Sequence, residues 1–228
     1  MLENQKTLKS KISFSGVGLH NGKVCKLDLI PEKINKGIYF VYKNLNKKIF
    51  GNWKNTHITQ LCTTLKSNKV YISTIEHLMS ALSGLGITNL RINISENEIP
   101  ILDGSSRDFV DKILEAGIVD QKKESKVVVV KKKIEIKKEN RFISIEPNNE
   151  KNFLTIDCEI NFNDQLIKKQ NLLYEHTFEN YLKIYNARTF CLQKDLEKIF
   201  SMGLGKGGSL DNAIIVSGEK ILNQDGLR

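Results

Sequence analysis

The sequence predicts an α+β fold of two similar domains, each a β-sheet layer packed against helices. Three observations lead to this prediction. Short segments that alternate polar and apolar residues come first, as in half-buried strands. An apolar stripe at helical spacing follows them. The same succession begins again after a polar, charged stretch at Gln121–Ser125, which we interpret as a linker. We therefore expect one domain over residues 1–122 and a second, incomplete one over residues 126–228, with a ligand site between them.

The length and composition are those of a globular protein. The 228 residues are enough to bury a hydrophobic core, and 40% of them are apolar and 27% charged. No apolar run is long enough to cross a bilayer. The segment Met1–Gly16 lacks the apolar core of a signal peptide. We expect a cytoplasmic protein, present as a monomer, with at most peripheral membrane contact.

The net charge of +9 comes from an excess of lysine. The densest basic stretches, Lys122–Lys123 and Lys131–Lys133, flank the apolar run Val127–Val130. Nucleic-acid-binding proteins more often concentrate their charge in one patch with stacking aromatic residues. We interpret these lysines as solvated strand ends and expect no nucleic-acid partner. An affinity for anionic lipid or nucleotide phosphate stays open as an alternative.

Four cysteines stand far apart in the sequence, as Cys25, Cys62, Cys158 and Cys191. They form no CxxC pair, so the pattern is typical of neither a zinc ribbon nor a disulfide framework. We expect reduced thiols that are mostly buried as small apolar side chains.

Strands of the first domain are expected where polar and apolar residues alternate. In one of them, Val24, Leu27 and Leu29 are the candidates for inward-facing positions. The expected strands are Gln5–Ser15, Val24–Ile30, Gly37–Tyr42, Val70–Ile72 and Asn89–Ile94.

A first helix is expected from the apolar stripe. The stripe recurs at positions i, i+3, i+4 and i+7, through Ile75, Leu78, Met79 and Leu82. Ser73 or Thr74 can cap the start of this helix, and Gly84 and Gly86 can end it.

A second helix is expected over Phe109–Ala116, with Gly117 as its end. Its shared apolar face consists of Phe109, Ile113 and Leu114. The turn before it contains Asp103 and Ser105, either of which can cap the helix.

The second domain repeats the succession of strands and helices. Its expected strands are Val127–Val130, Lys133–Ile136, Phe142–Glu146, Phe153–Ile160 and Ala213–Val216, and its expected helices are Tyr181–Tyr185 and Leu192–Phe200. Gly203–Gly208 formally fits GxGxxG, but a dinucleotide fingerprint follows a strand and opens a helix. We expect instead a loop, either flexible or lining a bound substrate.

The most informative local feature is the pair Glu76-His77 in the first turn of the first helix. A carboxylate beside a metal-binding imidazole suits a zinc hydrolase, because the metal lowers the pKa of its bound water and the carboxylate takes the proton. The alternative is a capping box, Ser73-x-x-Glu76, in which Glu76 accepts a hydrogen bond from the N-cap amide. Thr189 likewise suits either an oxyanion donor or a packed turn. The local sequence alone leaves both questions open.

Six segments, in their order along the chain, together resemble one known family. They are Gly16–Lys23, Ile72–Leu78, Glu98–Ser105, Ala187–Phe190, Gly207–Asp211 and Asn223–Arg228. Each segment has low specificity by itself, but the ordered combination resembles the zinc-dependent UDP-3-O-acyl-N-acetylglucosamine deacetylases of lipid A biosynthesis. The likeness runs from about residue 5 to the last residue.

This resemblance implies two α+β domains with the active site between them and one catalytic Zn²⁺ ion. It implies a hydrolase that converts UDP-3-O-acyl-N-acetylglucosamine to acetate and the free amine. His77 would be a zinc ligand, Glu76 the general base and Thr189 the donor to the oxyanion. Phe162 would lie in the nucleotide pocket and Leu19 beside the acyl chain. The full set of implied substrate contacts is Leu19, Cys62, Thr63, Phe162, Phe190 and Gly208.

The sequence departs from the family in its ligand set. The resemblance implies that the other two zinc ligands come from a His-x-x-x-Asp motif beyond the position of Arg228, and that a later histidine is the general acid. The histidines of this sequence are His20, His57, His77 and His176, and only His77 matches a ligand. A catalytic zinc takes three protein ligands. We therefore expect a C-terminally truncated chain that is inactive on its own. The alternative is a non-catalytic protein that binds the UDP-sugar or its acyl chain.

Overall fold

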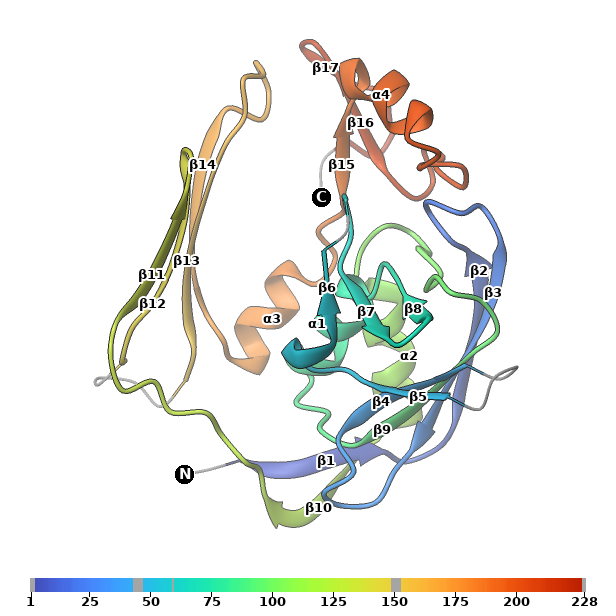
Figure 1. Cartoon of the computed structure of the whole chain (residues 1–228), viewed down its shortest axis with the longest axis vertical. Coiled ribbons are helices and arrows are strands. Elements are labelled where there is room, and N and C mark those ends of the chain that lie inside the picture. Colours follow the sequence, from blue (N-terminus) through green and yellow to red (C-terminus); the bar gives the residue numbers. More distant parts are fainter. Residues whose placement is uncertain (1–2, 43–46, 59, 149–152, 227–228) are drawn as a thin grey trace.

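The first half of the chain is built on a mixed sheet in the computed structural model, which describes residues 3–42, 47–58, 60–148 and 153–226. In spatial order, its strands are β2 (Ile12–Val17), β3 (Val24–Pro31), β9 (Leu90–Ile94), β4 (Ile38–Tyr42) and β5 (Lys47–Phe50). Neighbouring strands pair antiparallel except β9 and β4, which run parallel. The helices α1 (Glu76–Gly84) and α2 (Arg107–Ala116) share one core with this sheet (Figure 1). The predicted α+β class is therefore confirmed.

Two smaller sheets complete the first half. One is the antiparallel pair of β1 (Asn4–Leu8) and β10 (Ile118–Glu124), which ties the start of the chain to the end of this half. The other leads directly into α1, and its strands are β6 (Thr56–His57), β7 (Thr64–Ser67) and β8 (Val70–Ile72). A 3-10 turn at Trp53–Asn55 precedes it.

The inward face of β3 follows from the period of two along a strand. Leu27 and Leu29 are fully buried, as expected. Val24, expected to face inward with them, is 60% exposed. It lies an odd number of residues from Leu27 and therefore points to the opposite face, and Cys25 is the third buried residue of this strand.

The two helices bury the faces that their periodicity predicts, with one exception. The stripe of α1 packs into the core through Ile75, Leu78 and Leu82, with Met79 half-buried beside them. In α2, Phe109 and Ile113 are fully buried, but Leu114 is exposed and Val110 takes its place. Val110 stands one turn before Ile113 on the same face, whereas Leu114 is turned about 100° away from Ile113. Gly117 ends α2 with a φ of 83°. Among the residues that the structure describes, no helix is long and apolar enough to span a membrane.

The segment between the halves differs from the prediction. Gln121–Glu124, expected within a linker, belongs to β10 and pairs with β1. The stretch without regular structure lies later, at 125–133, and it contains Val127–Val130, which was expected as a strand. The valines favour a strand, but β propensity forms one only where a partner strand accepts the backbone hydrogen bonds.

The second half consists of small separate sheets instead of one layer. Its elements are β11 (Ile134–Lys138), β12 (Arg141–Ile145), β13 (Thr155–Asn161), β14 (Lys169–Glu175), α3 (Phe178–Ile184), β15 (Phe190–Leu192), α4 (Leu196–Ser201), β16 (Ile214–Ser217) and β17 (Lys220–Ile221). The hairpin strand β14 and the short β17 were not predicted. The expected helix over Leu192–Phe200 is only partly present, because Leu192 ends β15 and a 3-10 turn precedes α4.

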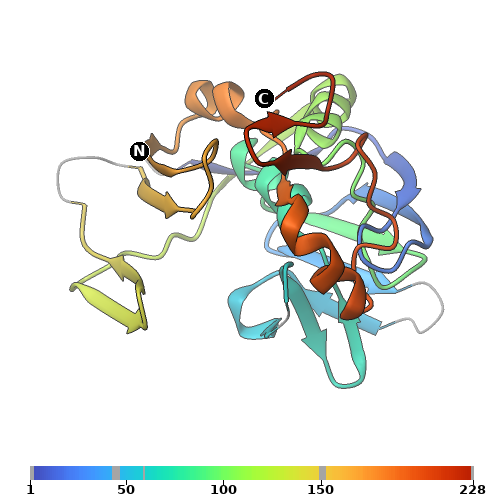
Figure 2. The same cartoon turned by 90° about the horizontal axis from the view of Figure 1, so that it is seen from above.

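The two hairpins of the second half, β11–β12 and β13–β14, stand away from the first half (Figures 1 and 2). The register of β11 and β12 places four isoleucines on one face, and all four are exposed: Ile134, Ile136, Ile143 and Ile145. The buried apolar cluster of this half is small and consists of Ile167, Leu192, Ile214 and Val216. Among the described residues, the second half is therefore stabilised largely by its contacts with the first half.

Helix α3 makes the central docking contact. Tyr181 is 4% exposed, and its ring packs on Gly84 at the end of α1. A Cβ atom built at Gly84 would lie 2.2 Å from two carbons of the ring, so no other residue fits there without a shift. The hydroxyl groups of Tyr181 and Ser80 are 3.0 Å apart, which gives the contact a polar component.

A second docking contact lies at the turn before α2. The Thr189 amide donates a hydrogen bond to the Gly104 carbonyl at 2.8 Å. Gly104 has a φ of 82°, and a Cβ atom built there would lie 2.1 Å from the Asn212 carbonyl oxygen. Both the backbone conformation and the close approach require glycine at this position.

We expect Gly84→Ala to destabilise the protein by about 1–3 kcal/mol, because the added methyl group overlaps the Tyr181 ring. In a Tyr181→Ala background the same change should stabilise by up to about 1 kcal/mol, because the overlap is gone and alanine is the better helix former. Urea unfolding of the wild type, both single variants and the double variant measures the sign of the change in unfolding free energy in each background. An equal loss of unfolding free energy in both backgrounds would show that overlap with the Tyr181 ring is not the cause of the destabilisation.

Candidate active site

Glu76 and His77 begin α1 at a cavity between the two halves. The cavity has a volume of about 260 Å³. Its lining consists of Glu76, His77, Ser80 and Ser106 from the first half and Tyr181, Ile184, Tyr185 and Ala187 from the second. One wall carries the carboxylate and the imidazole, and the other is mainly aromatic and aliphatic. The cavity therefore depends on the docking of α3 onto α1.

The Glu76 carboxylate is bound by main chain outside its own helix. The Thr63 amide donates to Oε2 of Glu76 at 3.0 Å, and the Ile75 amide donates to the Thr63 carbonyl at 3.3 Å. The capping-box alternative is wrong, because Ile75 is the N-cap and no side chain caps the helix. Ser73 is engaged elsewhere, and both its amide and its hydroxyl donate to the Asn97 carbonyl. The turn before β7 thus fixes the direction of the carboxylate.

Burial favours the neutral form of the His77 imidazole. Burial lowers its pKa from the ordinary 6.5, and the neighbouring carboxylates Glu76 and Asp103 act in the opposite direction without reversing the shift. A neutral imidazole has the lone pair that binds a metal ion. The Ser106 hydroxyl donates to the main-chain oxygen of His77 at 3.0 Å and so ties the start of α2 to α1.

Within the described ranges, no three His, Cys, Asp or Glu side chains are grouped so that they could hold a metal ion. His77 is thus a single candidate ligand beside Glu76. A catalytic zinc site takes three protein ligands. These residues therefore do not by themselves fit a complete zinc centre.

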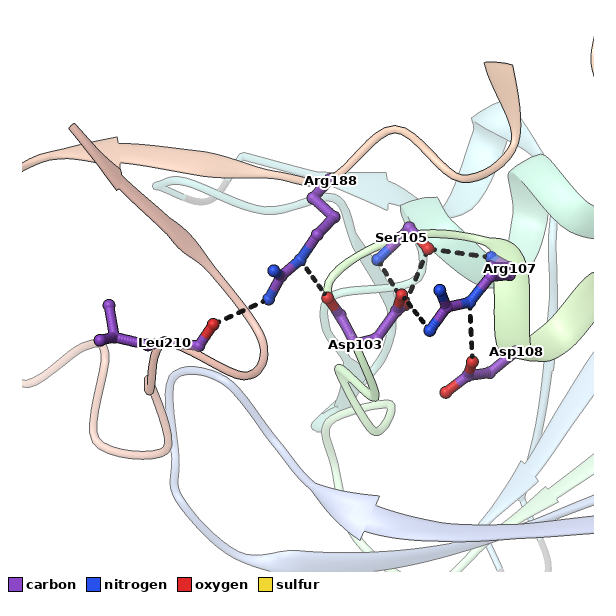
Figure 3. A network of polar contacts seen from close by, with 6 residues as sticks. All are labelled: Asp103, Ser105, Arg107, Asp108, Arg188 and Leu210. Carbon is purple, nitrogen blue, oxygen red and sulfur yellow. Dashed lines mark hydrogen bonds and ion pairs between the residues drawn. The ribbon is translucent and has the colours of Figure 1, made fainter. Parts of the chain in front are cut away.

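Asp103 links the turn before α2 to the second half through the network in Figure 3. Its carboxylate accepts hydrogen bonds from the Ser105 amide at 3.0 Å and hydroxyl at 2.7 Å and pairs with Arg107 at 3.1 Å. Its carbonyl accepts from Arg188 Nε at 2.7 Å, and Arg188 Nη2 donates to the Leu210 carbonyl at 3.0 Å. Neither predicted residue is the N-cap of α2, which is Ser106 and makes no side-chain cap bond. The Ser105 hydroxyl accepts from the Arg107 amide at 3.1 Å, and Asp103 holds the turn.

Thr189, predicted as an oxyanion donor, lies immediately before β15. Its amide donates a hydrogen bond to the Gly104 carbonyl, and its carbonyl accepts one from the Ile214 amide. Its methyl carbon lies 3.5 Å from the Cβ position of Gly104. Thr189 is next to Arg188 and the Asp103 turn, and it is not among the described residues that line the Glu76 cavity.

Phe162 lines a second, wider cavity, and its ring packs against that of Phe190, which is not among the described lining residues. Their ring centroids are 5.2 Å apart in an edge-to-face arrangement. The cavity has a volume of about 1080 Å³ and is lined by Phe162, by Leu192 and by many polar residues. Its charged lining residues are Lys168, Lys169, Lys194, Asp164 and Glu219. The cavity thus combines one aromatic ring with a surplus of positive charge.

Leu19 and Gly208 meet where the Gly203–Gly208 loop packs on the turn before β3. The Gly207 amide donates to the Leu19 carbonyl at 3.0 Å, and a side chain at Gly208 would begin 3.7 Å from Leu19. The loop follows α4 and precedes β16, which is the order that the sequence predicted. The structure therefore brings these two predicted substrate contacts together.

Cys62 and Thr63 lie in the turn before β7. Cys62 is half-buried, and its Sγ is 3.7 Å from the Thr64 hydroxyl. Through the hydrogen bond from Thr63 to Glu76, this turn is joined to the start of α1. Cys62, Thr63, Glu76 and His77, predicted from separate motifs, therefore occupy one region.

The sequence analysis did not single out Glu98, which organises this region. Its carboxylate is 1% exposed and accepts hydrogen bonds from the amides of His20 at 2.8 Å and Asn21 at 2.7 Å and from the Thr74 hydroxyl at 2.9 Å. Thr74 has a φ of 57°, an uncommon conformation for a β-branched residue. Glu98 thereby fixes the entry into α1. An acidic residue in an otherwise apolar turn was the only signal of this role.

The residues that the second half contributes to the Glu76 cavity were also missed. Tyr181 in α3 and Tyr185 at its C-cap stand four positions apart and so share a face. This spacing predicts that one face of the helix is buried, but it does not identify the element that covers that face. Only the docked structure shows that the surface is α1 beside Ser80.

Comparisons with known proteins cover nearly the whole chain. A family model described as UDP-3-O-acyl N-acetylglycosamine deacetylase matches residues 5–228. Proteins named UDP-3-O-acyl-N-acetylglucosamine deacetylase from Campylobacter fetus and Campylobacter hominis are 40% and 39% identical over 225 residues, or 98% of this chain and 76% of each relative. A protein of the same name from Helicobacter hepaticus is 38% identical over 98% of this chain and 74% of its own length. The chain is thus similar to about three quarters of each relative.

We expect His20 and His77 to titrate on opposite sides of 6.5, the ordinary histidine value. The pKa of His20 is raised above all by the Cys62 side chain, with Glu98 adding to the rise and burial opposing it, whereas burial lowers the pKa of His77. Proton–nitrogen NMR in metal-free buffer, assigned with His20→Gln and His77→Gln, measures both values. The reverse order of the two pKa values would contradict this account of the site.

Proposed function

This chain belongs to the family of UDP-3-O-acyl N-acetylglycosamine deacetylases, and from that membership we propose that its site serves zinc-dependent hydrolysis of the N-acetyl amide of UDP-3-O-acyl-N-acetylglucosamine, a step of lipid A biosynthesis. The observation that carries the proposal is a carboxylate, Glu76, that the Thr63 amide holds beside the buried His77 imidazole at a cavity between the halves. The products are acetate and the free amine of the sugar.

The proposed role of Glu76 is proton transfer. Amide hydrolysis needs a water oxygen to bond to the carbonyl carbon while a base accepts the water proton. This role is supported by the Thr63 amide, which binds Oε2 of Glu76 and so fixes the direction of the carboxylate at the cavity. The C–N bond then breaks as the nitrogen receives a proton, and acetate and amine separate.

The proposed role of Thr189 is to stabilise the oxyanion that forms on the carbonyl oxygen. Support comes from its rigid main chain, which Gly104 and Ile214 hold on both sides. Leu19 and Gly208 are proposed contacts for the acyl chain, because they present adjoining apolar surface. Phe162 and Phe190 are proposed contacts for the nucleotide end of the substrate.

Zinc would lower the pKa of a bound water and so supply the nucleophile. We propose His77 as one ligand, since burial lowers the pKa of its imidazole and so favours the neutral, metal-binding form. The described residues offer no cluster that would complete the coordination. We therefore propose that the 228-residue chain on its own does not turn over substrate, and that the family's reaction requires ligands in addition to those described.

The purified chain is expected to retain far less than one zinc per molecule after dialysis, because a single imidazole does not hold the ion. Elemental analysis measures the metal, and acetate release from the acylated UDP-sugar measures turnover. His77→Ala is the control and should leave the small zinc content unchanged. One tightly held zinc that His77→Ala removes, or any acetate release that Glu76→Gln abolishes, would contradict the prediction.

A second candidate function is binding of the UDP-sugar without hydrolysis, and the cavity at Phe162 favours it. Phe162 offers a ring for stacking on a base, and Lys168, Lys169 and Lys194 surround it with positive charge suited to a diphosphate. Lys194 is held over the cavity by its hydrogen bond to the Asn163 carbonyl at 3.1 Å. Binding at this cavity needs no metal.

Calorimetric titration with UDP tests this second function. We expect Phe162→Ala to weaken UDP binding by about tenfold, because base–aromatic stacking contributes about 1–3 kcal/mol. Phe142→Ala is the matched control, since Phe142 is exposed on β12 and should leave binding unchanged. No heat of binding from a chain shown to be folded would remove the binding function.

A further inference from the structure

Residues 47–72, which include β5 and the sheet of β6, β7 and β8, expose charge of one sign. This segment has five lysines and no aspartate or glutamate. All five are exposed, and none of them forms an ion pair among the described residues: Lys47, Lys48, Lys54, Lys66 and Lys69. The sheet projects from one side of the first half in Figure 2. We call the exposed residues of this segment the basic surface.

The basic surface also exposes large apolar side chains between its lysines. Trp53 is 77% exposed, Ile58 is 95% exposed and Leu61 is 58% exposed. Among the described residues of the first half, no other large apolar side chain is as exposed as Trp53 or Ile58. Single exposed apolar residues are ordinary, but a group of them within one short segment indicates an interaction surface.

Trp53 stands on a turn that hydrogen bonds hold in place. The Lys54 amide donates to Oδ1 of Asn52 at 3.1 Å, and the Thr56 hydroxyl donates to the Trp53 carbonyl at 2.7 Å. Nζ of Lys54 lies 5.6 Å from the centroid of the Trp53 ring. The turn thus presents an indole ring and an ammonium group together, a combination suited to the boundary between apolar and aqueous phases.

The outer face of the small sheet continues the basic surface. Lys66 on β7 is paired in register with Tyr71 on β8, and its Nζ lies 3.5 Å from Nε2 of His57 on β6. The Trp53 turn and β5 both contact β7, so the turn and this face are neighbours. Leu61 lies two residues before Thr63, whose amide binds Glu76. The basic surface is therefore continuous with the turn that holds the candidate base.

One carboxylate faces the basic surface from another element. The hydrogen bond from the Tyr39 hydroxyl is the main cause of the lowered pKa of Glu32, and Lys48 adds to the effect. Nζ of Lys48 also lies 3.5 Å from the centroid of the Tyr39 ring. Because the charge of Lys48 is partly compensated, Lys54 and Lys66 are the better positions at which to test the basic surface.

The exposed isoleucine face of β11–β12 differs from the basic surface in its charge. Three cations of that hairpin and its flanks pair with carboxylates of the same region: Lys133 with Glu146 at 3.4 Å, Lys137 with Glu135 at 3.0 Å and Arg141 with Glu139 at 3.7 Å. These pairs offset much of its positive charge. Only the basic surface combines exposed apolar side chains with a surplus of one charge, and this difference indicates the kind of partner it fits.

We propose that the basic surface docks on an anionic phospholipid bilayer, with its lysines at the headgroup phosphates and Trp53, Ile58 and Leu61 in the interface. Nucleic acid would satisfy the lysines, but it offers no apolar phase for the aliphatic side chains of Ile58 and Leu61. A lipid surface accommodates both. The inference goes beyond the proposed hydrolysis and does not depend on it, because it concerns a surface outside the Glu76 cavity.

Trp53 is the single tryptophan of the sequence, so the fluorescence of the 228-residue chain reports directly on the basic surface. We expect its emission to shift to shorter wavelength with vesicles of equal parts phosphatidylglycerol and phosphatidylcholine, and to stay unchanged with phosphatidylcholine alone. The shift should disappear at about 1 M salt, where the Debye length is about 3 Å. No shift with the anionic vesicles, from a chain shown to be folded by circular dichroism, would overturn the proposal, as would an equal shift with the neutral vesicles.

The double variant Lys54→Gln/Lys66→Gln tests the charges. We expect it to weaken vesicle binding by about twentyfold, because each lysine near an anionic membrane contributes about fivefold. Lys132→Gln/Lys138→Gln is the matched control, since both lysines are exposed on the second half and the net charge falls equally. Equal weakening by the two double variants would show attraction to net charge only and would overturn the docking surface.

Ile58→Ser tests the apolar contact without disturbing the core, because Ile58 is 95% exposed. We expect about fivefold weaker binding to the anionic vesicles, since the side chain loses its transfer from water into the interface. Val128→Ser, a change at an equally exposed aliphatic residue of the second half, should leave binding unchanged. Binding that Ile58→Ser does not weaken would contradict insertion.

Two further measurements compare other occupants of the basic surface. A Trp53 shift that appears without lipid and grows with protein concentration would assign the surface to a second copy of the chain and overturn the proposal. Tighter binding to a duplex DNA oligonucleotide than to the anionic vesicles, at the same salt concentration, would overturn the choice of lipid. We expect neither result.

Discussion

The docking of the second half onto α1 and the Asp103 turn is the constraint on which the candidate site depends. The Tyr181 ring occupies the space that a side chain at Gly84 would fill, and the Asn212 carbonyl does the same at Gly104. Glycine at both positions allows two packed surfaces to approach more closely than any other residue would permit. The Glu76 cavity has one wall from each half, so these contacts set its shape.

A buried carboxylate arranges the polar wall of the cavity. An ionised carboxylate in the interior is unfavourable unless its oxygens are hydrogen-bonded. Three donors satisfy Glu98, two from the turn after β2 and one from Thr74. Because Thr74 leads into α1, the same bonds that stabilise Glu98 also place Glu76 and His77. Glu98 also accepts a hydrogen bond from the His20 amide, and its charge helps to raise the pKa of the His20 ring.

Local pattern predicted most elements of the first half, and its errors have identifiable causes. Leu27 and Leu29 were placed correctly by alternation, and Val24 was not, because it has the opposite parity. The second half was harder to predict, since its hairpins are short and the run Val127–Val130 finds no partner strand in the described structure. Ser73 and Glu76 fit a capping box by spacing, but in the structure Ser73 is hydrogen-bonded to Asn97 and Glu76 to Thr63 instead. Sequence spacing carries no information about such distant partners.

By itself the sequence determined the α+β class and the family, and it predicted Glu76 and His77 as site residues, because periodicity and ordered motifs are local properties of a chain. Tertiary structure alone decided that Thr63 holds Glu76, that Tyr181 forms the opposite wall, and that Glu98 binds the His20 amide. These contacts join residues from distant parts of the chain, and they form only when the packed halves bring their elements together. The polarity and pKa of each side chain follow from those neighbours, and so the chemistry of the site is a property of the fold.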